Sequence, residues 1–223
     1  STIIANDPSY GRAFVYGNIM VKTSSAPATR MVHYGGDGAD ASRYRDLSLE
    51  FYNNTFVGRS TGSPTMYLFQ GSAGGTTGPS NAYNNIFYVA SGSIAVAYRY
   101  GDAYISHNGI TSGYSLSADG GTGHDDGTNI AGTSPGFVDY TNQDYHSTSG
   151  SACRNAGQAL PSLDLPDNNV VREYFKHQSS TARPSDGTLD IGAYEYGTPA
   201  ALTITTTSLP AGTVGTAYSQ TVQ

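Results

Sequence analysis

The stretch Phe51-Tyr52-Asn53-Asn54-Thr55-Phe56 decides the fold, because its layout recurs along the chain. Units of the same form occur at residues 16–20, 83–87 and 106–110. In each copy an apolar residue follows a fixed asparagine by two positions, and an aliphatic or aromatic residue or alanine precedes it by three. Several copies of one short unit indicate a repeat architecture.

The fixed asparagines are Asn18, Asn54, Asn85 and Asn108. The shortest interval separates the last two and fits one turn of a β-solenoid, whose repeats span roughly 20 to 45 residues. The longer intervals leave extra residues that would form loops outside the coil. Stacked coils would bring the four asparagines into register about 4.8 Å apart, where side-chain amides can pair in a ladder.

The apolar periodicity explains the form of the unit. In Leu47-Ser48-Leu49-Glu50-Phe51 apolar and polar residues alternate, as in a strand with one buried face. The next inward candidates are Asn54 and Phe56, so the alternation slips by one residue at Tyr52-Asn53, which indicates a corner between two strands. Asparagine suits a corner because it bonds to nearby backbone and tolerates the left-handed conformation. The pattern predicts an all-β parallel β-helix.

Segments outside the repeated unit predict further secondary-structure elements and the domain boundaries. Residues 65–69 and 93–98 fit strands between corners. Residues 167–177 fit a short helix capped by Asp167, with Val170, Val171, Tyr174 and Phe175 on one face. We expect β-helix coils over residues 1–116, an irregular C-terminal capping region over 117–197, and a linker with the first strands of a truncated β-sandwich over 198–223. The chain begins abruptly, as if inside a larger protein.

Composition narrows the class of partner. The net charge of −6 argues against nucleic acid or an anionic membrane, because both require a basic face. No run of about 18 apolar residues could span a membrane. The lone cysteine, Cys153, excludes an internal disulfide, and a buried, unreactive thiol is the favoured interpretation.

The asparagine-centred unit resembles the repeat of right-handed parallel β-helix proteins of the pectate-lyase-like superfamily. The C-terminal part resembles the tail of bacterial β-helix proteins with a choice-of-anchor Q region. The resemblance rests on Ser134-Pro135-Gly136-Phe137-Val138-Asp139, Asp144-Tyr145-His146, Gly150-Ser151-Ala152-Cys153-Arg154-Asn155-Ala156-Gly157, Arg183-Pro184 and Asp190-Ile191-Gly192-Ala193-Tyr194-Glu195-Tyr196. Cys153 and Asn155 depart from that tail pattern, whereas the segment that begins at Asp190 keeps it.

Residues 204–218 resemble the start of a bacterial putative immunoglobulin-like domain. Together these resemblances imply a secreted or surface-displayed bacterial protein with coils upstream and another domain downstream. The superfamily contains polysaccharide lyases, glycoside hydrolases and proteins without demonstrated activity, so the fold alone does not assign the chemistry.

Two kinds of polysaccharide chemistry have candidate residues. A lyase needs a cation near the uronate carboxylate and a base for the neighbouring proton, whereas a hydrolase needs two carboxylates roughly 5 to 10 Å apart. Asp37 and Asp40 are the nearest carboxylate pair. The full candidate set is His33, Asp37, Asp40, Arg43, Arg45, Arg99 and Asp102, with Arg30 nearby. No specific motif marks these residues, and bracing of a long charged loop is the favoured alternative.

Metal chemistry has weaker support. Asp119, Asp125 and Asp126 are candidate calcium ligands, but their spacing is not that of an EF-hand or of nonapeptide repeats, and a surface turn is favoured. The five histidines lack metal-ligand spacing. His107 occupies the same corner position as Asn53, which favours a structural role. We therefore expect no obligatory cofactor.

A non-catalytic role is the alternative from another class. Tyrosines exposed on a flat β-helix face could stack on sugar rings, and Tyr98 and Tyr100 are the candidate substrate contacts, with Tyr16, Tyr52 and Tyr83 as further members. The corner tyrosines could instead stack on one another in adjacent coils. The sequence thus indicates an extracellular domain that recognises or processes polysaccharide, or a carbohydrate-binding or display module, and leaves open whether it is an enzyme.

Overall fold

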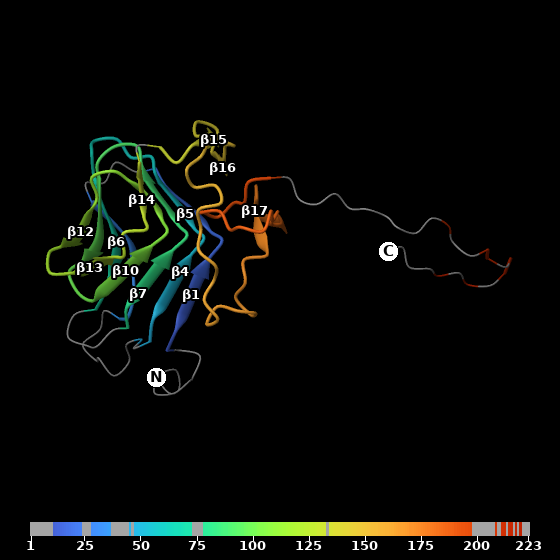
Figure 1. Cartoon of the computed structure of the whole chain (residues 1–223), viewed down its shortest axis with the longest axis horizontal. Coiled ribbons are helices and arrows are strands. Elements are labelled where there is room, and N and C mark those ends of the chain that lie inside the picture. Colours follow the sequence, from blue (N-terminus) through green and yellow to red (C-terminus); the bar gives the residue numbers. More distant parts are fainter. Residues whose placement is uncertain are drawn as a thin grey trace.

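The computed structural model describes residues 11–23, 28–36, 45, 47–72, 78–132 and 134–197, with isolated residues between 208 and 219. Every secondary-structure element assigned in this part of the chain is a strand. Three parallel sheets form a β-solenoid, as predicted (Figure 1). Within the described residues no helix is long and apolar enough to cross a membrane.

Each of the first four coils contributes one strand to each sheet, the fifth contributes strands to two of them, and every neighbouring pair within the three sheets is parallel. Sheet A contains β1 (Ala13–Tyr16), β4 (Leu49–Tyr52), β7 (Ser80–Tyr83), β10 (Asp102–Ser106) and β13 (Thr122–Asp125). Sheet B contains β2 (Ile19–Lys22), β5 (Thr55–Gly58), β8 (Ile86–Val89), β11 (Gly109–Thr111) and β14 (Ile130–Gly132). Sheet C contains β3 (Ala28–His33), β6 (Thr65–Gln70), β9 (Ser93–Tyr98) and β12 (Ser115–Ala118).

The predicted strands at 65–69 and 93–98 are confirmed as β6 and β9. The parallel strands also continue beyond residue 116, because β13 and β14 pair with β10 and β11. The helix predicted over 167–177 is wrong: turns lead into β17 (Arg172–Phe175), which pairs antiparallel with β18 (Ser179–Ala182). The side chains expected on one helical face divide instead, since Val170 is buried while Val171 and Phe175 are exposed.

An amide ladder runs through the corner between sheets A and B. Asn54 donates from its backbone N–H and its Nδ2 to Oδ1 of Asn85, at 2.9 and 3.1 Å. Asn18 donates in the same way to Asn54, and Asn85 to Asn108. The ladder has a fifth member, because Asn108 donates to Oδ1 of Asn129 at 2.9 Å.

The last member of the ladder is closed by a carboxylate. The Nδ2 of Asn129 donates to Oδ1 of Asp125 at 2.7 Å. In the other four ladder asparagines Nδ2 donates to the asparagine of the next coil. The same carboxylate accepts hydrogen bonds from the Gly127 N–H and the Tyr114 hydroxyl. Asp125 therefore takes the acceptor position that a further coil would supply.

The left-handed conformation belongs to the residue before each of the first four ladder asparagines, and not to the ladder asparagine itself as the sequence suggested. These preceding residues are Gly17, Asn53, Asn84 and His107, with φ of 69°, 48°, 56° and 49°. The turn points their side chains outward, where Asn53 and Asn84 bond to the C-terminal segment. The backbone N–H of His107 donates to Thr128 Oγ1, so this histidine has a structural role at the corner.

Aromatic rings stack on both faces of sheet A. Inside, Phe51 of sheet A packs in the core against Phe87 of sheet B, with ring centroids 6.2 Å apart. Outside, Tyr16, Tyr52 and Tyr83 form a parallel stack with centroid spacings of 5.0 and 5.2 Å. Tyr52 and Tyr83 are buried, so the interpretation of these rings as free sugar platforms is wrong and the alternative of stacking between coils holds.

Residues 134–197 form a C-terminal arm that packs along the outside of the coils (Figure 1). The Tyr52 hydroxyl donates to the Asn168 carbonyl at 2.6 Å, and the Tyr83 hydroxyl donates to buried Asp164. The arm carries two antiparallel hairpins, one of β15 (Phe137–Asp139) with β16 (Asp144–Ser147) and one of β17 with β18. A buried Arg183–Glu195 ion pair of 2.9 Å fastens its end.

Substitution of Asn85 tests the ladder. In Asn85→Ala the buried Asn54 N–H loses its side-chain partner and the Phe51 and Tyr83 carbonyls each lose one hydrogen bond, and a buried group left unsatisfied costs about 1–3 kcal/mol. We expect the free energy of unfolding in urea to fall by about 3–5 kcal/mol. Asn18→Ala, at the exposed end of the same ladder, should cost less than about 1 kcal/mol. Equal losses in the two variants would contradict the ladder as a main source of stability.

The reactivity of Cys153 tests the packing of the arm. Its thiol lies with Ile86 and Ile191 in a buried cluster, and burial raises its pKa to about 11. A raised thiol pKa means less thiolate near neutral pH, so a disulfide reagent should react about 100-fold more slowly with the native protein than with the protein unfolded in guanidinium chloride. Comparable rates in the two states would show that the arm does not stay docked.

Candidate functional site

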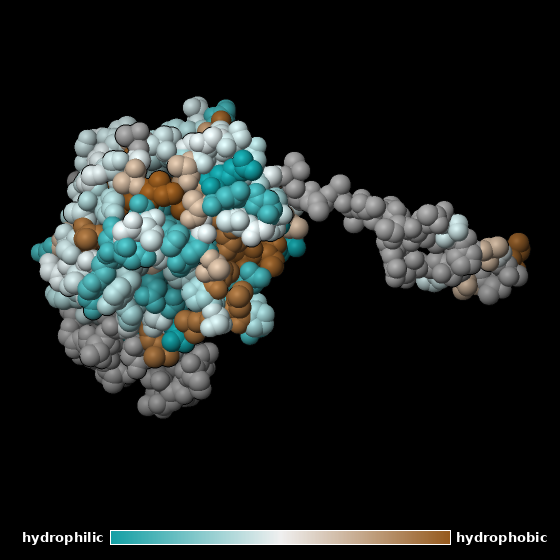
Figure 2. Space-filling view, in the orientation of Figure 1, coloured by the Kyte–Doolittle hydropathy of each residue, from teal (hydrophilic) through white to brown (hydrophobic). Residues whose placement is uncertain are grey.

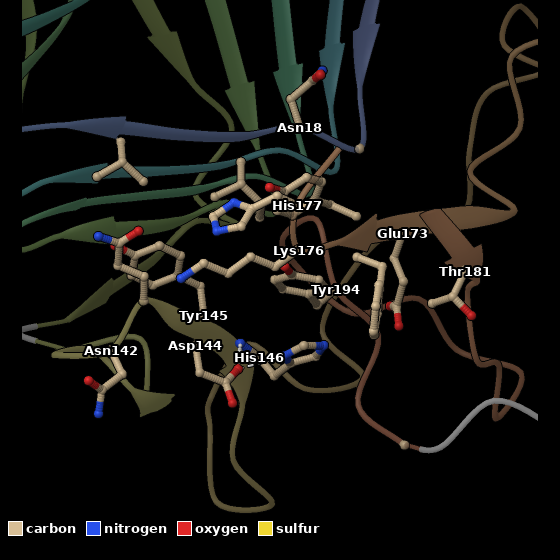
Figure 3. Close-up of a pocket in the computed structure, with 17 residues that line it drawn as sticks. Asn18, Asn142, Asp144, Tyr145, His146, Glu173, Lys176, His177, Thr181 and Tyr194 are labelled. Carbon is tan, nitrogen blue, oxygen red and sulfur yellow. Dashed lines mark hydrogen bonds and ion pairs between the residues drawn. The ribbon is translucent and has the colours of Figure 1, made fainter. Parts of the chain in front are cut away.

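A large open groove lies between the edge strand β2 and the two hairpins of the arm, and we name it the hairpin groove. Its volume is about 870 Å³. It is lined by Gly17, Asn18, Ile19, Val21, Asn142, Gln143, Asp144, Tyr145, His146, Glu173, Tyr174, Phe175, Lys176, His177, Thr181, Tyr194 and Gly197 (Figure 3). The groove thus combines aromatic rings with carboxyl, imidazole, amide and ammonium groups.

Aromatic packing on the outer face of sheet B holds the first hairpin in place. Phe137 and Tyr140 both pack edge-to-face on Tyr88 of β8, with centroids 5.9 and 5.7 Å apart. Phe137 also contacts Tyr145, which is buried. Arg59 of the coil lies 4.7 Å over the Tyr140 ring and donates to the Thr141 carbonyl. These contacts fix the strand that carries Asp144 and His146.

Asp144 and His146 form a paired carboxylate and imidazole in the groove. Asp144 Oδ1 lies 2.6 Å from His146 Nδ1, and both side chains are about half-exposed. The imidazole stacks on the Tyr194 ring with centroids 3.8 Å apart. Donation from Nδ1–H to Asp144 leaves Nε2 as a hydrogen-bond acceptor or proton acceptor. The geometry therefore orients one ring nitrogen for chemistry with a ligand.

Glu173 supplies a second kind of carboxyl group. It is buried, and its Oε2 accepts the Glu195 N–H at 3.2 Å. Burial raises the pKa of Glu173, although this hydrogen bond and the charges of His146 and Arg183 act in the opposite direction. A glutamate with a raised pKa keeps its proton to higher pH and can donate it. Tyr194 is affected likewise, because burial and then the charge of Glu173 raise its pKa to about 12.

The β17 end of the groove presents apolar and cationic groups. Phe175 is 61% exposed, and Lys176 and His177 follow it directly in the turn to β18. Figure 2 shows hydrophobic residues gathered over the arm beside β17. An exposed aromatic ring beside hydrogen-bonding side chains is typical of surfaces that bind a polar ligand with apolar faces.

Two of the candidates from the charged loop, His33 and Arg45, lie within the described residues. Asp37, Asp40 and Arg43 lie outside the described residues. His33 is exposed at the end of β3. Arg45 donates to the Arg12 carbonyl at 3.2 Å, which is a bracing contact of the loop.

Arg30 and Arg99 both pack on the ring of Tyr98, whereas Asp102 makes a separate contact with a histidine. Their guanidinium carbons each lie 5.1 Å from the Tyr98 centroid, and Arg99 also pairs with Asp119. Asp102 pairs with His124 at 3.2 Å. Tyr98 is 7% exposed under these contacts, so its ring face is not free for a sugar, whereas Tyr100 is 47% exposed.

The three candidate calcium ligands do not converge. Asp119 pairs with Arg99, Asp125 closes the amide ladder, and Asp126 accepts both the N–H and the hydroxyl of Thr128. The part of the chain that the structure describes contains no group of three or more His, Cys, Asp or Glu side chains suited to a metal ion.

Sequence reasoning missed the groove residues as a set. Asp144-Tyr145-His146 and Phe175-Lys176-His177 each place an aromatic ring beside polar groups, which was the available signal. The two segments come together only through packing of the arm on sheet B, and that packing has no repeat to reveal it. A scan against protein-family models and searches of the curated proteins and of the solved structures found no match for this chain.

Proposed function

We propose that this β-solenoid binds an extracellular polysaccharide in the hairpin groove. The observation that carries the proposal is one open groove of about 870 Å³ that combines an exposed phenylalanine with carboxyl, imidazole, amide and ammonium groups. Sugar rings have apolar faces that pack on aromatic side chains and hydroxyl groups that need several hydrogen bonds. The groove supplies both, and a non-catalytic carbohydrate-binding, adhesion or display module needs no more.

Cleavage of the bound polysaccharide is the second candidate function. Glu173 has the raised pKa of a proton donor, and His146 has an oriented nitrogen that suits a base. Lys176 supplies a cation that could neutralise a uronate carboxylate, as a lyase requires, while Asp144 and Glu173 supply two carboxyl groups for a hydrolase. The resemblance to pectate-lyase-like proteins supports either reaction.

The wider setting follows from the same proposal. The resemblances to a choice-of-anchor Q tail and to an immunoglobulin-like start favour a secreted or surface-displayed protein with a downstream domain. Asn18 lies at the open end of the ladder, and its Oδ1 accepts no hydrogen bond from the described residues. We expect a preceding coil of the same protein to stack on β1, β2 and β3, where it would add a further wall beside the groove.

Binding is tested by electrophoretic retardation in gels that contain soluble polysaccharides. We expect at least one neutral or acidic polysaccharide to retard the protein, and Phe175→Ala to weaken that affinity about 10-fold, or about 1.4 kcal/mol. Tyr100→Ala is the matched control, because it removes an exposed aromatic ring outside the groove. Unaltered mobility on every polysaccharide, or equal effects of the two variants, would reject the groove as the binding site.

Cleavage is tested by incubating the same polysaccharides with the protein. A lyase would release unsaturated products with new ultraviolet absorbance, and a hydrolase would release reducing ends without it. If cleavage occurs, Glu173→Gln should lower kcat at least about 100-fold while binding is retained, because proton transfer contributes about that much. Retardation without any products assigns the groove to binding alone. Products that Glu173→Gln leaves undiminished would place the chemistry elsewhere.

A further inference from the structure

The segment of the arm over residues 158–170, which we name the arm link, lies on the outer face of sheet A with few buried side chains. From residue 161 to residue 170 only Asp164 and Val170 are buried, and Leu163 and Leu165 are each 43% exposed. Aspartate is almost never fully buried unless it is paired. The docking of the arm link therefore depends on how one buried carboxyl group is accommodated.

Hydrogen bonds join the arm link to the coils at its start, its middle and its end. Gln158 and Asn84 exchange two hydrogen bonds of 2.8 Å between backbone and side chain. The Tyr83 hydroxyl donates to Asp164 Oδ2, and the Tyr52 hydroxyl donates to a carbonyl near the end of the arm link. Burial raises the pKa of both tyrosines, so their hydroxyls keep their protons. Among these contacts Asp164 is the group that can change its charge between acid and neutral pH.

The surroundings of Asp164 do not favour a negative charge. Asp164 is fully buried, and its Oδ1 has no hydrogen-bond partner. Glu50 of β4 is a second buried acid whose charge acts on Asp164, and its Oε1 accepts a hydrogen bond from Asn81 at 3.0 Å. Arg12 is the cation whose charge acts on Asp164, but its Nε donates to Ser48 Oγ at 3.0 Å, and it forms no ion pair with Asp164 in the described part of the chain.

The other titratable groups on this side of sheet A have partners of their own. They line the groove beside Leu163 and are Tyr104, His124, Asp125 and Asp126. The Tyr104 and His124 rings stack on each other, and His124 pairs with Asp102. Asp125 closes the amide ladder, and Asp126 accepts hydrogen bonds from Thr128. None of them supplies a free cation to Asp164.

The direction of the pH dependence follows from these contacts. Burial raises the pKa of Asp164, and the charge of Glu50 raises it further, whereas the Tyr83 hydrogen bond and the charge of Arg12 lower it; the net shift is upward. The pKa of an aspartate in a free segment is about 3.9. Because the pKa is higher in the docked state, docking is most favourable below that value and weakens as the pH rises through the raised pKa.

We propose that Asp164 and Tyr83 form a pH-sensitive latch that holds the arm link on sheet A. With its proton, the carboxyl group is neutral and its Oδ2 accepts the Tyr83 hydroxyl. When the carboxyl group loses its proton to water, an unpaired charge lies beside a second buried acid, which shifts the equilibrium toward a released arm link. Release uncovers the rings of Tyr52 and Tyr83, against which Val170 packs.

Amide hydrogen exchange of the whole chain, followed by mass spectrometry from pH 5 to pH 8, tests the latch. Asp164→Asn is the decisive variant, because a carboxamide keeps an oxygen for the Tyr83 hydroxyl and cannot ionise. The ratio of wild-type to variant exchange rates over residues 159–170 at each pH removes the intrinsic pH dependence of exchange. We expect this ratio to rise about 10-fold or more across the range, since ionisation opens only the wild type. A constant ratio would overturn the proposal.

A second variant keeps the test independent of how well the carboxamide fits. Glu50→Gln removes the charge beside Asp164, so the release of the arm link should begin at a higher pH than in the wild type. Asp186→Asn is the matched control, because Asp186 is an exposed carboxylate of the arm outside the arm link. Its exchange should follow that of the wild type at every pH. A release that Glu50→Gln leaves at the same pH, or that Asp186→Asn abolishes, would contradict the assignment to Asp164.

Discussion

The hydrogen-bonded ladder of asparagine amides is the constraint on which the rest of the molecule depends. At each of the first four corners between sheets A and B the chain turns with a left-handed residue, and buried carbonyls beside the corner, such as those of Phe51 and Tyr83, accept hydrogen bonds from the asparagine side chain. One asparagine per coil satisfies these carbonyls and pairs with the next coil. Since the side chain is buried, a shift of the register would leave several polar groups without partners, which is costly. The ladder therefore fixes the register of the sheets and, through it, the rows of side chains on their outer faces.

Those outer rows explain why the arm folds where it does. The residues that precede the ladder point outward, and Asn53 and Asn84 bond to the backbone of the arm at Asp190 and Gln158. The stacked tyrosines beside them provide an aromatic strip that Val170 covers. The hairpin groove is a result of this packing, because it has one wall from the coils and one from the arm. The coils thus act as a scaffold, and the candidate site lies where the non-repeating arm packs on them.

The sequence predicts the coils well because their signal is local and repeated. Alternation over a few residues and a fixed asparagine are sufficient to place the first four corners. The fifth, at Asn129, lacks the flanking pattern, since Asp126 precedes it where the other copies have an aliphatic residue, an aromatic residue or alanine. The helix over 167–177 fails for the opposite reason, because an apparent apolar face is divided between the coils and solvent. The hairpin groove joins segments that are distant in sequence, and no periodicity links Asp144 to Glu173.

The closure of the ladder by Asp125 gives the stack a polarity. Donors pass from each coil to the next in one direction, and the last donor ends on a carboxylate of its own coil. A second molecule that approached this end would meet an amide already occupied and a negative charge beside it. Open edges of parallel sheets are templates for fibre growth. Asp125 therefore ends the side-chain ladder at this edge, so that an added coil would find no free asparagine amide there to set its register.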